Sequence, residues 1–427
     1  MSVNQVDRPV FGGTTMGLRS SIRAALRQPL ADYYLVIMTV VLLAGIGLYE
    51  MISASSVLAM VMGQSPYYYG VHQAIMIAVG AIGAFVLSRM SRRALVVVSW
   101  AGIVMAIVLL ALIVVPGGFG FTTGGNQAWF DVGPVRFQPS EFAKVALVVW
   151  AAALFTRPAG VKQRGSVKAL LIPYVPIAGL VLGLVVAEKD MGTAVIVGAI
   201  IIALLWFAGA PGSLLGGAAV FGAVGAALLV IFDSVRRAKV LSFLGTLMPF
   251  LHLPATQTSD QPQNAIYALA TGGWWGVGPG ASRQKWGGLY NGAHTDYILA
   301  VLGEELGLLG ILVVLALMAT LIITGLRIAR RNDVMFWRLA AGGVATWFFI
   351  QAGFNTLVAF GMFPVMGVPF PFVSYGGSAI MAELFGIGLL LAAAMHEPAA
   401  IRELADRRAR RGAHRTTEVV VARRAPR

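Results

Sequence analysis

The sequence predicts an all-α integral membrane protein with ten transmembrane helices, both termini in the cytoplasm and a large extracytoplasmic loop between helices 7 and 8. Three observations support this fold class. Of the 427 residues, 58% are hydrophobic and only 12% are charged, whereas a soluble domain carries about a quarter charged residues. Apolar runs long enough to cross a hydrocarbon core of about 30 Å recur along the chain. Basic residues are concentrated in alternate connecting segments.

The apolar runs define the domain organisation. Residues 1–32 are polar and basic without a cleavable signal pattern, so we expect a cytoplasmic tail there. Residues 33–396 form the expected membrane domain, and residues 397–427 an arginine-rich cytoplasmic tail without regular structure. The expected helices are 33–54, 71–90, 94–116, 139–156, 168–187, 191–209, 212–232, 297–326, 335–360 and 376–396.

The distribution of positive charge sets the orientation. With the N-terminus inside, 24 of the 32 lysines and arginines fall in cytoplasmic segments and seven fall outside, while Lys144 lies within a helix. This asymmetry follows the positive-inside rule, which explains the net charge of +14 without a nucleic-acid partner. The C-terminal run RRARRGAHR is expected either to enforce the topology or to bind anionic lipid of the inner leaflet.

Three extracytoplasmic segments are longer than a turn requires, namely 117–138, 233–296 and 361–375. Long loops in compact domains are usually functional or disordered. The stretch QNAIYALATGGWWGVGPG within 233–296 is apolar and glycine-rich, which suggests a segment that lies on the membrane or dips into it. We therefore expect the function to reside on the outer face.

The stretch QPSEFAKVAL opens the fourth helix with two charged residues at membrane depth. Glu141 and Lys144 are three residues apart and share one helix face, while Pro139 occupies the first turn beside Ser140. Charges inside a membrane are costly and are functional candidates. The pair is expected either to line a polar cavity that holds substrate or to form a structural ion pair between helices.

The stretch NGAHTDYILAVLGEELGLLG places a carboxylate at the outer end of the eighth helix. Asp296 is expected either to cap this helix or to act in catalysis, with His294 and Thr295 beside it as donors. Glu304 and Glu305 lie two turns deeper, and one of them is expected to face the bundle interior.

The third candidate segment is FPVMGVPFPFVSYGGSAI, whose three prolines forbid a regular helix. Irregular backbone at membrane depth must be buried in protein or line a cavity. Ser374, Gly376, Gly377 and Ser378 can present backbone amides to an anion, although an ordered loop explains the pattern equally well. In AEKDMGTAV, we expect Asp190 to cap the sixth helix.

Several common chemistries are excluded by the sequence. The chain has no cysteine, no GxxxxGK nucleotide loop and no GxSxG elbow. Its five histidines are scattered without zinc-ligand spacing. An ATP-driven pump, a serine hydrolase and a zinc protease are therefore not expected.

Taken together, the motifs resemble the SEDS family (shape, elongation, division and sporulation), whose members include FtsW and RodA. The resemblance covers roughly residues 30 to 396 and rests on FQPSEFAK (137–144), AHTDYILAVLGEELG (293–307) and PFPFVSYGGS (369–378), in the family's order. Gln351, Asn355 and GGWWGVGPG (272–280) also fit. RQPLADYYLVI and SASSV resemble the division-type branch of actinobacteria more than the elongation type.

The resemblance implies a ten-helix fold in the bacterial inner membrane and peptidoglycan glycosyltransferase activity on lipid II during septal cell-wall synthesis. It implies that Asp296 matches the family's essential aspartate. It also implies a partner class B penicillin-binding protein transpeptidase (FtsI-like), other divisome proteins, and a divalent cation (Mg²⁺ or Mn²⁺) without a dedicated site. The residues expected to contact substrate are Gln138, Ser140, Glu141, Lys144, His294, Thr295, Ser374, Gly376, Gly377 and Ser378.

The sequence departs from the family pattern at four notable positions. Gln127 stands where an arginine is common, Lys189 where proline is usual and Met366 where threonine is common. Glu383 is an unusual carboxylate within the tenth helix. None of these departures removes Asp296, Glu141 or Lys144.

Because lipid II is an α-linked pyrophosphate sugar and the product bond is β-1,4, the resemblance favours a single inverting displacement. Asp296 would act as general base on the acceptor 4-hydroxyl, and undecaprenyl pyrophosphate would leave. The alternatives are a lipid II flippase, an elongation-type (RodA) polymerase and a non-catalytic scaffold for the cross-linking enzyme.

Overall fold

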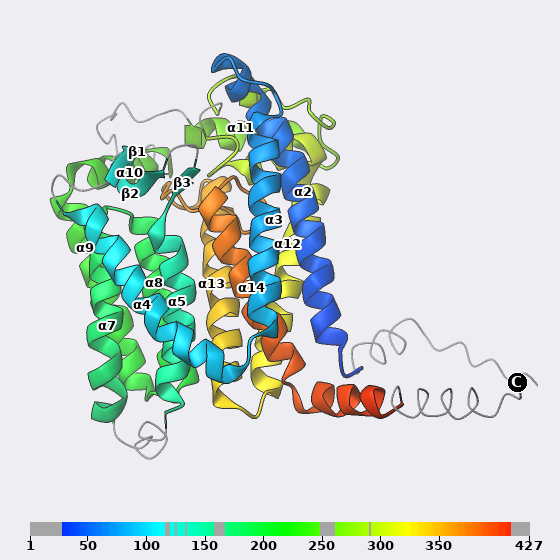
Figure 1. Ribbon diagram of the computed structural model, residues 1–427. Coiled ribbons are helices and arrows are strands. Elements are labelled where there is room, and N and C mark those ends of the chain that lie inside the picture. Colours follow the sequence, from blue (N-terminus) through cyan, green and yellow to red (C-terminus); the bar gives the residue numbers. More distant parts are fainter. Residues whose placement is uncertain are drawn as a thin grey trace, which may run out of the picture.

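The computed structural model describes residues 28–115, 120–123, 126–132, 135–157, 167–247, 261–289 and 292–410. Most of the expected N-terminal tail and residues 411–427 of the C-terminal tail lie outside these ranges. In Figure 1, long helices stand side by side, and a small sheet and short helices lie at the upper end. The chain is mostly helical, as expected.

Each of the ten predicted segments coincides with a helix. The largest difference in a boundary is at the end of the first, which continues to Val61. Pro139 opens its helix at the first position, and Ser91 caps another by accepting a hydrogen bond from the Ala94 amide at 3.3 Å. The helices are α2 (Ala31–Val61), α3 (Tyr68–Arg89), α4 (Arg92–Val114), α5 (Pro139–Phe155), α7 (Val167–Ala187), α8 (Met191–Phe207), α9 (Gly212–Phe232), α12 (Ile298–Arg331), α13 (Met335–Ala359) and α14 (Gly377–Met395).

Six helices in the described parts of the chain are long and apolar enough to cross a membrane: α2, α3, α4, α9, α12 and α14. Two shorter apolar helices cover Ile172–Ala187 and Met191–Phe207. None of the residues of α9 is buried, as expected of a helix surrounded by lipid. The chain is therefore a multi-pass membrane protein.

The expectation of an all-α fold is wrong at the upper end, where residues of the 117–138 segment form a three-stranded antiparallel sheet. Its strands are β1 (Gly120–Thr123), β2 (Asn126–Val132) and β3 (Val135–Phe137), in the order β1-β2-β3. Threonine, valine and aromatic residues in this segment favour extended backbone over helix. The 233–296 segment also contains regular structure, namely α10 (Ser234–Leu247), α11 (Gln261–Gly272) and a 3₁₀ turn, η2 (Gln284–Trp286).

The expectation of an unstructured C-terminal tail is wrong for its first part, because residues 398–410 are helical. In Figure 1, this helix extends sideways from the lower end of the bundle and does not continue along the long helices. Alanine, leucine, glutamate and arginine are strong helix formers, and an exposed Arg407–Glu403 pair at 2.7 Å adds i,i+4 support.

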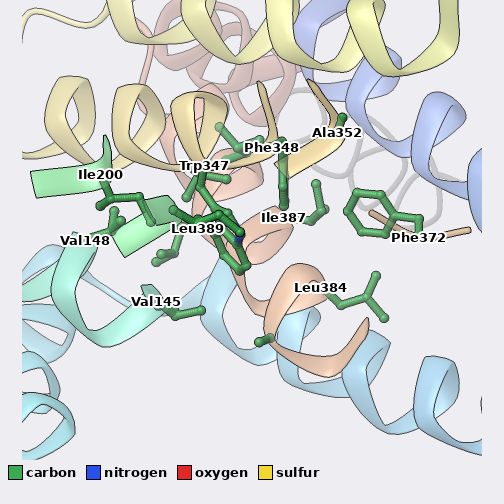
Figure 2. Close-up of a cluster of buried hydrophobic side chains, with 14 of the residues drawn as sticks. Val145, Val148, Ile200, Trp347, Phe348, Ala352, Phe372, Leu384, Ile387 and Leu389 are labelled. Carbon is green, nitrogen blue, oxygen red and sulfur yellow. The ribbon is translucent and has the colours of Figure 1, made fainter. Parts of the chain in front are cut away.

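The centre of the bundle is a hydrophobic core between α5, α8, α13 and α14 (Figure 2). Trp347 and Phe348 of α13 are fully buried there, and Phe372 packs edge-on against Phe348 with ring centroids 5.3 Å apart. Phe372 comes from the proline-rich segment before α14. The core therefore anchors this irregular segment against helices that carry the charged candidates.

Candidate functional site

The backbone of residues 294–296 is fixed by three successive hydrogen bonds at the upper end of the bundle. The carbonyl of His294 accepts from the Tyr375 amide at 2.8 Å, and that of Thr295 accepts from Ser374 Oγ at 2.7 Å. The carbonyl of Asp296 accepts from Asn355 Nδ2 at 3.1 Å. Two of the predicted segments, AHTD and VSYGGS, are thus joined to each other and to α13.

The Asp296 side chain is half-buried and lies just before α12. Tyr297 is the N-cap of that helix, and no side chain of the described residues caps it. The capping alternative is therefore not what the structure shows. Burial raises the pKa of Asp296 to about 6; Asp190 raises it further, and Lys239 of α10 opposes the shift. A carboxyl with such a pKa is suited to accept a proton near neutral pH.

Asp190 caps α8, which confirms the prediction. It accepts from the Thr193 amide at 3.0 Å and from the Thr193 hydroxyl at 2.8 Å. Gln138 Nε2 also donates to Asp190 Oδ2 at 2.8 Å. Burial raises the pKa of Asp190, and Glu141 and Lys144 both act on it electrostatically. Asp190 therefore lies within electrostatic range of both Asp296 and the charged pair of α5.

Glu141 and Lys144 form a buried ion pair of 2.7 Å within α5. Lys144 also donates to Gln351 Oε1 at 3.1 Å and lies 4.8 Å from the centroid of the Trp347 ring. Gln351 Nε2 in turn donates to Glu383 Oε1 at 2.9 Å. The ion pair itself lies within α5, and the hydrogen bonds made by Lys144 and Gln351 connect it to α13 and α14.

Glu383 of α14 belongs to this same network. Its second oxygen accepts from the Phe372 amide at 2.9 Å. Gln351 also donates to the Pro369 carbonyl at 3.1 Å. The carboxylate thereby satisfies an amide of the proline-rich segment that no helix could satisfy.

Sequence reasoning missed Glu188, which lies in the turn between α7 and α8. Its side chain is buried, and both carboxylate oxygens lack a hydrogen-bond partner among the described residues. Burial raises the pKa of Glu188 to about 9, with a further contribution from Asp190. The only signal in the sequence was a second carboxylate two residues before the helix cap.

His294 lies just before α12, in an aromatic group with Tyr69 of α3 and Tyr375. Its ring centroid is 5.7 Å from that of Tyr375 and 5.6 Å from that of Tyr69. Burial lowers the pKa of His294 to about 4, so the imidazole is neutral at pH 7. Its Nδ1 atom is buried and has no partner among the described residues.

The remaining predicted residues occupy different places. The hydroxyls of Ser140 and Ser378 are buried and have no partner among the described residues. Gly376 is the N-cap of α14 and Gly377 its first residue, beside His72. The structure shows no contact that joins Ser140, Ser378 or Gly377 to Asp296 within the described ranges.

Gln127 and Lys189, two of the positions singled out in the sequence, have local explanations in the structure. The Gln127 amide donates to the Glu188 carbonyl at 3.1 Å, and Gln127 Nε2 donates to the Ile113 carbonyl at 3.1 Å. Gln127 thus ties the sheet to α4 and to the α7–α8 turn. Lys189 has a φ of 64°, which proline cannot adopt. Met366 packs against the core, and nothing in the structure explains its replacement of threonine.

Among the described residues, no group of three or more histidines, aspartates or glutamates is placed to hold a metal ion. Glu188 and Asp190 provide two neighbouring carboxylates, and that of Glu188 has no hydrogen-bond partner within the described ranges. Mg²⁺ often binds through one or two carboxylates together with substrate phosphates. These residues therefore fit a cation that arrives with an anionic substrate.

Comparison with known proteins agrees with the arrangement described above. A family model for cell cycle proteins of the FtsW, RodA and SpoVE type matches residues 33–399. A probable peptidoglycan glycosyltransferase FtsW of Mycobacterium tuberculosis is 37% identical over 389 residues, which cover 90% of this chain and 72% of that protein.

Two solved structures are similar in fold. One belongs to a peptidoglycan synthase complex that coordinates polymerization and crosslinking, with a TM-score of 0.65 and 26% identity over 85% of this chain and 97% of that chain. The other is the rod shape determining protein RodA of Thermus thermophilus, with a TM-score of 0.60 and 26% identity over 85% of this chain and 96% of that chain. The chain therefore belongs to the FtsW/RodA/SpoVE family of cell cycle proteins.

Proposed function

We propose that this chain is a peptidoglycan glycosyltransferase that polymerises lipid II into glycan strands during septal cell-wall synthesis. Family membership and the names of its relatives support the activity. The observation that carries the proposal is the half-buried carboxylate of Asp296, whose pKa is raised to about 6 on a backbone fixed by three hydrogen bonds.

In this proposal, Asp296 removes the proton from the 4-hydroxyl of the acceptor sugar. The hydroxyl oxygen attacks the anomeric carbon of the donor as the bond to the pyrophosphate breaks, so the configuration inverts. The proton remains on Asp296 and the electron pair leaves with undecaprenyl pyrophosphate. A positioned general base typically contributes about 10²–10⁴-fold to such a step.

The leaving pyrophosphate gains negative charge, and two features are suited to balance it. Glu188 and Asp190 would hold a divalent cation, which supplies positive charge beside the pyrophosphate. Lys144 is the buried cation of the α5 network, and its partners Glu141 and Gln351 hold its ammonium group in place. The same proposal assigns the contacts with the two lipid II molecules, as acceptor and donor of the glycan, to further residues. These are Gln138, Ser140, His294, Thr295, Ser374, Gly376, Gly377 and Ser378.

The proposed topology has ten membrane spans with both termini in the cytoplasm. The lower end in Figure 1 then carries the arginine-rich helix 398–410 on the cytoplasmic side, near anionic lipid. The sheet, α10 and α11 then lie outside, together with Asp296. The partner expected there is a class B penicillin-binding protein transpeptidase, since a structural relative belongs to a complex that coordinates polymerization and crosslinking.

The test is a reconstitution with purified protein, its transpeptidase partner and fluorescent lipid II, with products separated on a gel. A ladder of glycan strands that requires this chain supports the proposal. If lipid II moves between leaflets but no polymer forms, the proposed polymerase activity is rejected in favour of a flippase. Because the partner adds its own chemistry, it is used as a variant without the transpeptidase nucleophile.

A further inference from the structure

We propose that Glu304, Glu305 and Lys285 are positioning residues that hold Asp296 in place through a short, separately anchored piece of helix. This inference rests on the proposed function, because it concerns the same carboxylate. It assigns a role to buried charges that the proposed reaction does not use.

Helix α12 is broken at Gly307, where the backbone leaves the helical region with φ 70° and ψ −172°. Residues 298–306 therefore form a half-helix of about two and a half turns. Asp296 lies two residues before this half-helix. Because the break interrupts the helical hydrogen bonds, the membrane-embedded second half cannot by itself fix the first half, and lateral contacts must do so.

Glu304 binds the half-helix to the segment around η2. Its carboxylate accepts from Ser282 Oγ at 2.5 Å, from the Arg283 amide at 3.0 Å and from the Gln284 amide at 3.2 Å. The side chain is fully buried. A buried carboxylate with this many donors is held strongly in one orientation.

Glu305 makes a second attachment through an ion pair with Lys285 at 2.8 Å, and both side chains are buried. The Gly280 amide donates to Glu305 Oε2 at 2.7 Å, while Lys285 Nζ donates to the Gly280 carbonyl at 2.7 Å. Lys285 also donates to Ser53 Oγ of α2 at 2.8 Å. The ion pair thus joins the half-helix, the η2 segment and α2.

The backbone at the break completes the attachment. The amides of Val277 and Gly278 donate to the carbonyls of Glu304 and Glu305 at 2.9 and 3.1 Å. Since the break leaves these carbonyls without their helical partners, the glycine-rich segment supplies the missing donors. A Cβ atom on Gly307 would lie 2.4 Å from the Trp274 carbonyl oxygen, so the close approach requires glycine there.

The half-helix is consequently held at both ends. Residues 294–296 are fixed by Tyr375, Ser374 and Asn355, and the other end is fixed by the carboxylates of Glu304 and Glu305. Glu304 is eight residues from Asp296, about 12 Å along a helix, so it acts on Asp296 only by placing it. A misplacement of about 1 Å can cost about 10²-fold in rate.

The test uses Glu304→Leu and the conservative Glu304→Gln in the full-length protein with its partner. The matched control is Asp32→Asn, which removes a buried carboxylate paired with Arg327 and Arg331 on the second half of α12, beyond the break. Two quantities are measured: kcat and KM for lipid II, and hydrogen–deuterium exchange of residues 298–306. Lys285→Met provides a second variant if Glu304→Leu fails to accumulate.

We expect Glu304→Leu to lower kcat at least tenfold with KM changed less than twofold, and to increase exchange in residues 298–306. Glu304→Gln should recover most of the loss, because it keeps an acceptor oxygen. Asp32→Asn should lower the thermal midpoint but leave kcat and the exchange of residues 298–306 unchanged. A Glu304→Leu protein with increased exchange and normal kcat would overturn the inference.

The exchange experiment also separates this inference from the proposed function. If Asp296→Asn is inactive and Glu304→Leu retains full kcat, only the positioning role is rejected. If Asp296→Asn polymerises normally, the assignment of the base is rejected, whatever the exchange of residues 298–306 shows.

Discussion

The pH dependence of polymerisation follows directly from the surroundings of Asp296. Burial raises the pKa of its carboxyl from an ordinary value near 3.8 to about 6, with Asp190 adding to the shift and Lys239 opposing it. A general base works only in its deprotonated form. Activity should therefore be complete above pH 7 and should be lost as the pH falls through 6.

The expected size of the effect can be worked out from this pKa. At pH 5, about one tenth of the carboxyl is deprotonated, so kcat/KM should be about tenfold below its plateau. With an ordinary pKa near 3.8, the loss at pH 5 would be less than about 10%. Lys239→Gln removes the positive charge that opposes the shift. The acidic limb of the pH–rate profile should therefore move to higher pH.

The assay is the initial rate of polymerisation of fluorescent lipid II between pH 4.5 and 8.5 at constant ionic strength. The control is Arg237→Gln, which removes an exposed charge from the same helix as Lys239. Lys189 is also exposed, but it neighbours Asp190 and is therefore unsuitable as a control. Arg237→Gln should shift the acidic limb of the pH–rate profile less than Lys239→Gln does. A profile that stays flat down to pH 5 would refute the reasoning.

Three further predictions concern the network, the cation and the break. Lys144→Met should lower the free energy of unfolding by about 3–5 kcal/mol, because it leaves Glu141 buried without its cation. In thermal unfolding, the double variant with Glu141→Gln should recover most of this loss. Glu188→Gln should raise the Mg²⁺ or Mn²⁺ concentration that gives half-maximal rate several-fold, and an unchanged concentration would remove Glu188 from the proposed cation site. Gly307→Ala should destabilise the protein by about 1–3 kcal/mol. The control Gly353→Ala, in open space on α13, should change the stability by less than about 1 kcal/mol in the same measurement.

The sequence was sufficient to locate the ten apolar helices of the bundle, because each one is a long apolar run whose length the membrane dictates. The Asp190 cap was also predictable, since an aspartate three residues before a threonine at a helix start is a local pattern. Both features depend on neighbours in the chain, which is why they could be identified without coordinates.

The features that escaped prediction depend on distant partners. GEELGLLG reads as one continuous helix, but its break at Gly307 is set by the approach of Trp274, more than thirty residues earlier. Glu383 is a carboxylate within an apolar helix, and the groups that bind it, Gln351 and the Phe372 amide, come from other segments of the chain. Glu188 appeared to be an ordinary turn residue because burial cannot be read from a turn sequence.

The strands were missed for a related reason. The residues of β1 to β3 lie in a glycine-containing segment without a clear two-residue alternation, so periodicity did not distinguish strand from loop. Contacts from outside the sheet stabilise it, such as the Gln127 amide bound to the Glu188 carbonyl at 3.1 Å. Short strands of this kind need neighbouring structure to be stable.

The role of the Asp296 carboxylate is tested most directly by comparing Asp296→Asn with Asp333→Asn, a matched change at an exposed aspartate beyond the opposite end of α12. Both purified variants are assayed for polymerisation rate and, separately, for lipid II binding. We predict that Asp296→Asn loses at least about 10²-fold in kcat with lipid II affinity retained, while Asp333→Asn behaves as the parent protein. An Asp296→Asn protein that elongates glycan strands at the parent rate would contradict the account.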